Sequence, residues 1–452
     1  MGKAKILVTF GPAIGGAPTF RKIAQTADGV RINTAHGSVR DHGSAIAFIR
    51  KNSPLPVVLD IKGPELRVFL DEPLNVKAGS LFTIGFSGPA RFSYDFSREA
   101  KKGDPIHFDD GKLDAEIVKI SPKGAEMRAK NPHSLKGGKN AHIPGRRLSI
   151  PSLSAKDVEE IALANKKSVE YVALSFTRTA GDVRSLRSKL DSGIAIIAKV
   201  ENAEGLANAD GILSEADGIM VARGDLALDI GAEKVPLAQK ALIKKCNNAG
   251  KLAITATQVL ETMIANPYPT RAEVSDIANA VLDGTDALML SGETAIGAYP
   301  LEAVRIMDKV SAEAESSVGC NVGLGSYADI SDAVSKSINT IARIMPLDAV
   351  VSITRSGYTA KMISRFRLNA RVIALTPNEQ VRRQLLLYFG VEPFFVPEIP
   401  ESRIIPTMAQ FLASKKLVSP NSVVLFTAGV RTRAQHASNL IELHKLDELL
   451  KK

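Results

Sequence analysis

The chain has 452 residues, of which 45% are hydrophobic and 23% charged, and its formal net charge is +10. This length exceeds what a single hydrophobic core usually organises, so we expect two to four domains. No segment approaches the ~20 consecutive apolar residues of a membrane span, and the N-terminus lacks the apolar stretch of a signal peptide, which predicts a cytoplasmic protein without a membrane partner.

The excess of basic residues does not indicate a nucleic-acid partner. Lysines and arginines are scattered along the chain, and no recognition motif gathers them. Anionic small substrates account for the charge equally well. The two cysteines, Cys246 and Cys320, are too few for a disulfide framework or a cysteine-based zinc site, and we interpret both as structural.

Short β-branched and apolar runs alternate with helix-like stretches before about residue 300, a pattern typical of βα units around a parallel sheet. The eight runs are Ile6–Phe10, Gly29–Asn33, Val57–Ile61, Tyr171–Phe176, Ile194–Val200, Gly218–Ala222, Leu252–Thr257 and Ala287–Leu290. They predict an α/β fold of the closed (β/α)8, or TIM, barrel type. Polar residues follow each run, and such barrels build their active sites at the carboxyl ends of the strands.

Residues 66–148 differ in texture from the barrel. They are rich in Gly and Pro and contain short alternating strands such as Leu113–Ile120. We interpret them as an inserted small β-barrel, connected near Pro64 and Pro151, that closes as a lid over the strand ends. The barrel domain then comprises residues 1–65 and 149–326.

Residues 327–452 contain a second α/β series, which predicts an open-sheet C-terminal α/β domain. Its expected strands are Ala349–Thr354, Arg371–Leu375, Val391–Val396 and Ser422–Thr427. The charged tail Leu440–Lys452 is expected to form a terminal helix.

Three charged residues are expected at neighbouring strand ends. Lys199 and Glu201 lie two apart on one strand, so their side chains point the same way, and the next strand delivers Asp225. Two such carboxylates can hold a hard divalent cation, and Lys199 would stabilise charge on a transferring phosphoryl group or an enolate. A lone Lys-x-Glu is more often a salt bridge on the barrel rim, but the convergence of all three favours a catalytic site.

Two arginines, Arg31 and Arg67, are candidate anion contacts, because a guanidinium can bind phosphate through two hydrogen bonds. By the two-residue period Arg31 shares a direction with Asn33, and Asp60 with Lys62. Surface solvation explains an isolated arginine equally well. No Gly-x-x-x-x-Gly-Lys-Ser/Thr loop is present, so a nucleotide would be held by metal ions and basic side chains.

Seven short motifs occur along the chain in a fixed order. They are RINTAHG at 31–37, LDIKGPELR at 59–67, AKVEN at 198–202, MVARGDL at 220–226, ATQ at 256–258, PTRAE at 269–273 and MLSGETA at 289–295. With these motifs the chain resembles the pyruvate kinase family over essentially its whole length. The resemblance implies transfer of the phosphoryl group of phosphoenolpyruvate to ADP, the final step of glycolysis, with Mg²⁺ or Mn²⁺ and in a homotetramer.

The resemblance also implies roles for single residues. The divalent cation is expected at Glu201 and Asp225. Phosphoenolpyruvate is expected at Arg31, Gly224, Asp225 and Thr257, and ADP at Asn33, His36, Arg67 and Lys139. The catalytic residues are expected to be Lys199, Arg31 and Thr257. The enolate would gain its proton from the region around Thr257 through water, because a threonine hydroxyl alone is a weak acid.

The monovalent-ion site of the family is altered in this chain. Of its ligands Asn33 and Asp60 remain, whereas Ala35 replaces a serine and Ile61 replaces a threonine that binds through its backbone carbonyl. The lost hydroxyl predicts weak or absent dependence on potassium. Glu65, often lysine in potassium-independent members, argues the other way.

One loop of the last domain has the character of an anion site. Its residues Thr354, Ser356, Gly357 and Thr359 follow a strand and open a helix, where hydroxyls and free amides are available. A helix cap with a turn explains the same residues. The loop resembles the effector-phosphate loop of the family, which implies a phosphorylated effector, helped by Arg431 or Arg433, and a regulatory role for this domain.

Two other functions compete with this interpretation. A metal-dependent carbon–carbon lyase acting on pyruvate or its enolate also places acidic ligands at barrel strand ends, but it would not need a nucleotide-closing lid. A metabolite sensor that keeps the fold without catalysis would be indicated by broken chemistry, whereas Lys199, Glu201, Asp225 and Thr257 are intact.

Overall fold

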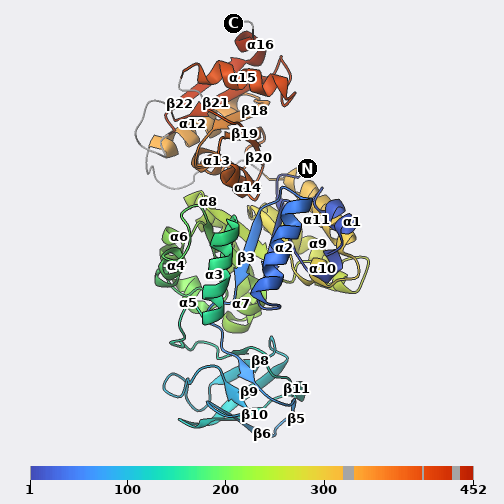
Figure 1. Cartoon of the computed structure of the whole chain (residues 1–452), viewed down its shortest axis with the longest axis vertical. Helices are drawn as coiled ribbons and strands as arrows, with labels where there is room; N and C mark the ends of the chain where they lie inside the picture. The colour runs from blue at the N-terminus through green and yellow to red at the C-terminus, as the bar shows by residue number, and fades with distance from the viewer. Residues whose placement is uncertain (1, 319–329, 400–401, 430–437, 451–452) are drawn as a thin grey trace.

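The computed structural model describes residues 2–318, 330–399, 402–429 and 438–450. Three parts follow one another along its long axis, with the barrel in the middle, the β-rich insert at one end and the last α/β domain at the other (Figure 1). Within these described ranges, no helix is long and apolar enough to cross a membrane.

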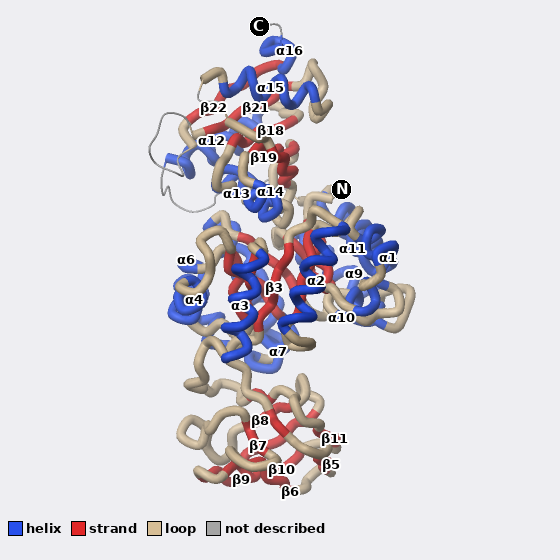
Figure 2. Tube along the Cα trace, viewed as in Figure 1, coloured by secondary structure: helices blue, strands red, loops and turns tan. Residues whose placement is uncertain are grey.

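The central part is a closed barrel of parallel strands, as the sequence predicts. Its strands are β1 (Lys5–Thr9), β2 (Gly29–Asn33), β3 (Val57–Ile61), β13 (Tyr171–Leu174), β14 (Ala195–Val200), β15 (Gly218–Ala222), β16 (Leu252–Ala256) and β17 (Ala287–Leu290). Helices surround the barrel (Figure 2). Nearly all of the strand residues are buried, because inward side chains fill the barrel and outward side chains pack under these helices.

Four of the helices around the barrel begin at capping boxes. The side chains of the four N-cap residues each accept a hydrogen bond from the backbone amide three residues later, and the acidic side chain at that later position accepts one from the N-cap amide; these residues are Ser38, Ser154, Thr179 and Thr270. The helices are α1 (Ala17–Ile23), α2 (Val39–Asn52), α3 (Ala155–Lys167), α4 (Ala180–Arg187), α5 (Ala203–Ala207), α6 (Ala209–Glu215), α7 (Arg223–Ile230), α8 (Val235–Ala249), α9 (Arg271–Leu282), α10 (Gly292–Ala295) and α11 (Pro300–Glu315). These caps define where several of the polar strand-end loops stop.

The insert has a hydrophobic core of its own, which contains Phe82, Phe92, Phe96 and Phe108. Its strands are β4 (Val68–Phe69), β5 (Leu74–Val76), β6 (Leu81–Gly85), β7 (Arg91–Phe92), β8 (Pro105–Phe108), β9 (Leu113–Ser121), β10 (Gly124–Ala129), β11 (His133–Leu135) and β12 (Ala141–His142). A seven-stranded sheet runs in the order β12-β8-β9-β10-β6-β7-β4, and β11 pairs with β5. A bridge between Arg67 and Asn140 joins the two edges of the larger sheet, which therefore curls on itself.

The last domain is an open sheet in the order β20-β19-β18-β21-β22. Its strands are β18 (Ala349–Ile353), β19 (Arg371–Thr376), β20 (Val391–Phe395), β21 (Val423–Ala428) and β22 (Leu440–Lys445), and its helices are α12 (Ile330–Ile344), α13 (Tyr358–Ser364), α14 (Glu379–Leu385), α15 (Ile404–Ser414) and α16 (Leu446–Leu450).

The predicted terminal helix over Leu440–Lys452 is wrong in its first half. Residues Leu440–Lys445 form strand β22, which pairs antiparallel with β21, and helix α16 covers Leu446–Leu450. The ring of His444 packs against that of Phe426, with 6.5 Å between the centroids. This tertiary contact and the β21 ladder outweigh the local helix signal of the charged tail.

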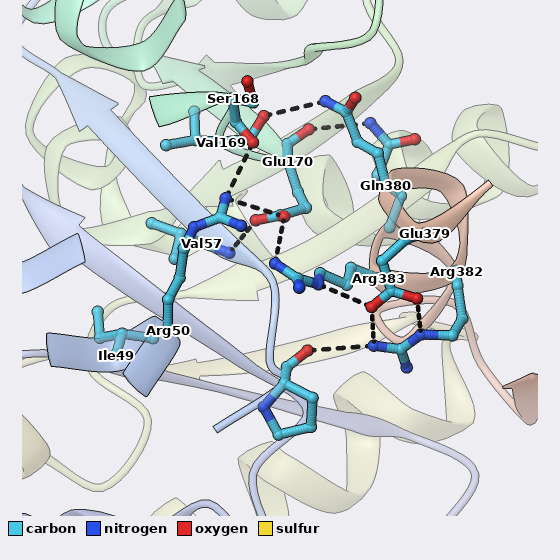
Figure 3. A network of polar contacts seen from close by, with 12 residues as sticks. Ile49, Arg50, Val57, Ser168, Val169, Glu170, Glu379, Gln380, Arg382 and Arg383 are labelled. Atoms are coloured by element: carbon cyan, nitrogen blue, oxygen red, sulfur yellow. Dashed lines mark hydrogen bonds and ion pairs between the residues drawn. The ribbon is translucent and has the colours of Figure 1, made fainter. Parts of the chain in front are cut away.

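The last domain docks on the amino-terminal end of the barrel, where Glu170 precedes β13 (Figure 3). The Glu170 carboxylate, 2% exposed, accepts hydrogen bonds from Arg50 at 3.1 Å, from Arg383 of α14 at 3.5 Å and from the first amide of β3 at 2.8 Å. Gln384 of α14 donates to the carbonyls of Glu170 and Gly193 at 3.0 and 2.9 Å. Helix α14 therefore contacts the starts of β3, β13 and β14, whose other ends face the insert.

Candidate active site

A cavity of about 170 Å³ lies at the carboxyl ends of the barrel strands, beneath the insert. Seven of the residues predicted for catalysis or binding line it, namely Arg31, Asn33, Arg67, Lys199, Glu201, Asp225 and Thr257. They come from segments far apart in the sequence, and the closure of the barrel brings them together.

Lys199 is the central cation of the cavity. Its Nζ lies 3.0 Å from Glu201 Oε1, 3.3 Å from Asp60 Oδ2 and 2.7 Å from the hydroxyl of Ser175. Burial opposes the charge on Lys199, but the two carboxylates outweigh it and raise the pKa of the ammonium group. Lys199 is therefore a fixed positive charge at neutral pH.

Arg31 is the second buried cation. Its Nε donates to Asp60 Oδ2 at 2.7 Å, and its Nη1 donates to the Thr9 hydroxyl at 3.1 Å. Burial would raise the pKa of Asp60, but the charges of Lys199 and Arg31 hold it below its usual value. Asp60 thus orients both cations toward the cavity.

Glu201 and Asp225 are the carboxylates that could hold a divalent cation. Glu201 Oε2 accepts the Phe176 amide at 2.5 Å, which fixes its direction. Burial, followed by the neighbouring charge of Glu201, raises the pKa of Asp225 to about 7. Two acids that resist joint ionisation fit a divalent cation, whose charge would relieve the repulsion.

The donor set also limits how such a cation is held. Over the described ranges, no group of three or more His, Cys, Asp or Glu side chains is placed to bind a metal. A cation at Glu201 and Asp225 would complete its shell with water and substrate oxygens, as Mg²⁺ commonly does at phosphate sites.

Thr257 and Gly224 meet at the ends of β15 and β16. Thr257 has a left-handed backbone, with φ of 63°, and its hydroxyl oxygen accepts the Gly224 amide at 2.9 Å while donating to the Ala256 carbonyl at 2.7 Å. Arg223 holds this turn by donating to the Thr257 carbonyl at 2.7 Å and by pairing with Asp276 at 2.6 Å. The strained turn presents the Thr257 side chain to the cavity.

The four predicted nucleotide contacts are not all in one place. Asn33 and Arg67 line the cavity, whereas His36 and Lys139 lie outside its lining. Arg67 pairs with Glu65 at 2.5 Å, and Lys139 pairs with Asp109 at 2.7 Å within the insert. In this arrangement Lys139 is engaged away from the barrel.

The predicted monovalent-ion ligands are already bound to protein groups. Asn33 Oδ1 accepts the Ala35 amide at 3.1 Å. Asp60 Oδ1 accepts the Ser175 hydroxyl at 3.1 Å, and its other oxygen binds Arg31 and Lys199.

Sequence reasoning missed four polar residues of the site: Thr9, Ser175, Asp110 and Asn140. Ser175 directly follows β13, so its position at a strand end was a usable signal. Asp110 belongs to an Asp-Asp-Gly turn with φ values of 51°, 57° and 80° and exchanges two hydrogen bonds with Asn140, at 3.0 and 2.8 Å. No signal in the sequence places that turn of the insert over the barrel.

The hydroxyls of the predicted effector loop make contacts within the last domain. The Thr354 oxygen accepts the Gly357 amide at 2.9 Å, and the Thr359 hydroxyl is hydrogen-bonded to that of Ser438. These contacts are those of a turn and helix start. Arg431 and Arg433 lie outside the described residues.

Comparison with known proteins finds one family over the whole chain. Models of the pyruvate kinase barrel domain and of the pyruvate kinase alpha/beta domain match residues 1–304 and 332–444. The pyruvate kinase of Geobacillus stearothermophilus is 38% identical, the match covering 100% of this chain and 81% of the relative. That of Clostridium acetobutylicum is 36% identical, covering 99% and 100%. The crystal structure of a pyruvate kinase from Cryptosporidium parvum gives a TM-score of 0.90 at 31% identity, covering 98% of this chain and 96% of that one.

Proposed function

The chain belongs to the pyruvate kinase family and is a phosphotransferase, and on this premise we propose that its catalytic cavity transfers the phosphoryl group of phosphoenolpyruvate to ADP, giving pyruvate and ATP. The observation that carries the proposal is the meeting of Lys199 with Glu201 and Asp225 beneath the insert. A fixed cation beside two carboxylates suits a reaction in which negative charge moves between oxygens.

Glu201 and Asp225 are the residues that would hold Mg²⁺ or Mn²⁺. A divalent cation there supplies positive charge to phosphate and enolate oxygens. Lys199 stabilises the charge that develops on the transferring group without changing its own protonation state. Arg31, preorganised by Asp60, orients the substrate phosphate.

Phosphoenolpyruvate would contact Arg31, Gly224, Asp225 and Thr257. The Thr257 hydroxyl is held by two backbone groups, so its role is to direct a water that protonates the enolate. ADP would lie on the side of Asn33 and Arg67. The lid is residues 66–148, inserted in the sequence between barrel segments 1–65 and 149–326. When the lid closes over the strand ends, His36 and Lys139 would reach ADP.

Replacement of Lys199 tests the proposal. In an assay of pyruvate formation from phosphoenolpyruvate and ADP, we expect Lys199→Met to lower kcat by at least ~10²-fold, because a preorganised charge at the transferring group is lost. The control is Lys245→Met, which removes a lysine paired with exposed Asp210 and should change nothing. Equal rates for wild type and Lys199→Met would contradict the mechanism, and a loss of rate that simply follows a loss of folded protein would also count against it.

We also propose that potassium has little role. The Asp60 carboxylate is engaged by Arg31, Lys199 and Ser175, and Ala35 offers no hydroxyl. Activity should persist when potassium chloride is replaced by tetramethylammonium chloride. A collapse of activity in that salt would refute this proposal.

Allosteric control is proposed from the family resemblance. The loop of Thr354, Ser356, Gly357 and Thr359 would bind the phosphate of an effector, in a cytoplasmic homotetramer whose last domain, 327–452, is regulatory. If so, Ser356→Asp with Thr359→Asp should abolish any shift that a panel of sugar phosphates causes in phosphoenolpyruvate saturation. An unchanged shift would argue against the site, and sedimentation of the intact protein checks the tetramer.

A further inference from the structure

Helix α7 carries proposed substrate and cation contacts at its start and contacts to the insert at its end. Gly224 and Asp225 lie in its first turn, and Leu228 and Asp229 lie about one turn later, roughly 6 Å along the axis. Leu228 meets the tip of the insert at Gly111, where φ is 80° and an added Cβ would lie 2.7 Å from the Leu228 side chain. A single helical turn thus joins the cavity to the lid.

Asp229 binds the segment by which the chain leaves the insert. Its Oδ1 accepts His142 Nε2 at 2.8 Å and the Gly145 amide at 3.1 Å. Its Oδ2 accepts the Ala203 amide, at the start of α5, at 2.5 Å. With a side chain only 5% exposed, Asp229 uses both oxygens to tie the lid linker to two barrel helices.

Polar contacts, rather than a shared hydrophobic core, hold this side of the lid. The buried apolar residues of the insert form a cluster separate from those of the barrel. A cavity of about 310 Å³ lies between the linker and helices α5 and α7, beside Asp229. Because the buried apolar clusters of the insert and the barrel are separate, no continuous core supports this junction when a hydrogen bond is lost.

We propose that Asp229 is a positioning residue that couples lid closure to helix α7, so that ligands which order the first turn of α7 also draw the lid over the nucleotide. The proposal rests on the proposed function in placing ADP beneath the lid. This coupling requires a carboxylate at position 229. The two carboxylate oxygens accept hydrogen bonds from three N–H donors, whereas the amide of asparagine has one oxygen and would turn its NH₂ group toward those donors.

Kinetics of matched variants test the coupling. We expect Asp229→Asn and His142→Ala each to raise KM for ADP about tenfold, the effect of losing one charge-assisted hydrogen bond. KM for phosphoenolpyruvate should rise less than KM for ADP, because phosphoenolpyruvate is also proposed to contact Arg31 and Thr257, which lie outside α7. His142→Gln keeps a hydrogen-bond donor and should show the wild-type KM for ADP. The double variant of Asp229→Asn and His142→Ala should have a KM for ADP no higher than that of Asp229→Asn alone. The controls are His107→Ala, which breaks a pair with Asp114 inside the insert, and Asp210→Asn, which breaks an exposed pair.

The position of the lid can be measured directly. Spin labels at Glu116→Cys on β9 and Lys244→Cys on α8, both exposed positions, in a Cys320→Ser chain would report the lid-to-barrel distance. With Mg²⁺ and ADP, we expect a narrowed distribution in wild type and a broad one in Asp229→Asn and His142→Ala.

Unchanged KM for ADP and unchanged distances in both variants would overturn the proposal, as would equal increases in KM for both substrates. Should Asp229→Asn fail to fold, His142→Ala, at a side chain 27% exposed, decides the question. A wild-type protein without activity on phosphoenolpyruvate and ADP would refute the proposed function, while the distance measurement would still test Asp229.

Discussion

The charges of single residues in the catalytic cavity depend on one another. Asp60 pairs with both Arg31 and Lys199 and orients them in a buried place, and the charges of Lys199 and Arg31 lower the pKa of Asp60 despite burial. Asp225 faces a different balance, because the neighbouring charge is that of Glu201 and adds to the cost of burial. The result is a cavity with two permanent cations and one acid that titrates near neutrality.

Binding of a divalent cation to the free protein should therefore weaken as the pH falls below about 7. Protonated Asp225 is not a ligand, so protons compete with the cation below its pKa, whereas above it the carboxylate is ionised and the affinity levels off. Titration of Mn²⁺ by electron paramagnetic resonance over about pH 6 to 8 measures this dependence.

Glu201→Gln is the informative companion variant for that titration. It removes the neighbouring negative charge and should move the midpoint to lower pH, while also weakening binding through loss of a ligand. Equal dissociation constants at both ends of the pH range in wild type would show that Asp225 does not titrate there.

At the scale of elements, helix α14 lies at the amino-terminal ends of three strands that carry residues of the cavity. Strands β3, β13 and β14 begin at its contacts, and they carry Asp60, Ser175 and Lys199 at or just past their other ends. Each of these strands is hydrogen-bonded to a neighbouring strand on both sides. A displacement at the start of a strand is therefore transmitted to the residues at its other end. Glu170 is the residue that binds all of these parts together (Figure 3).

Glu170→Ala should destabilise the protein by about 2–3 kcal/mol, because Arg50 and Arg383 lose a buried partner and the first amide of β3 loses its acceptor. The chain contains no tryptophan, so urea unfolding is best followed by circular dichroism. Glu392→Ala is the matched control, since it breaks an ion pair with Arg371 that is about 40% exposed on both sides and should cost no more than ~1 kcal/mol. Equal midpoint shifts for the two variants would contradict a structural role of Glu170.

On the scale of the whole molecule, the chain combines two kinds of junction. The last domain shares a hydrophobic cluster with the amino-terminal end of the barrel, in which Leu387 and Tyr388 pack with Leu7, Val58 and Tyr171. The insert instead has a separate core and meets the barrel through polar contacts and single close approaches. One junction is suited to holding two domains as a unit, and the other to letting a lid move.

Calorimetry of the intact protein should accordingly show the insert unfolding separately from the rest. The expected trace has one transition for the insert and another for the barrel with the last domain, because cooperativity follows shared cores. A single transition with equal calorimetric and van't Hoff enthalpies would contradict this division.

The sequence by itself determined the barrel strands, the β-rich character of the inserted region and the common direction of Lys199 and Glu201. Alternation, capping residues and the two-residue period of a strand are local properties, so they can be read without knowing the fold. The ordered motifs carried the family resemblance and, through it, the expected reaction, and the comparisons show the same family.

Only the tertiary structure decided which distant groups meet. Asp60 reaches Lys199 across β13 because β3 and β14 pair with the two edges of that strand, Asp110 reaches the cavity because the insert folds over it, and Leu440–Lys445 becomes a strand because β21 offers an open edge. Asp229 has no distinguishing local sequence pattern. Its proposed role follows from three donors that folding brings to it, namely two backbone amides and the imidazole of His142. Contacts of this kind depend on closure and docking of separately folded parts, whose free energies are not encoded in any short stretch of sequence.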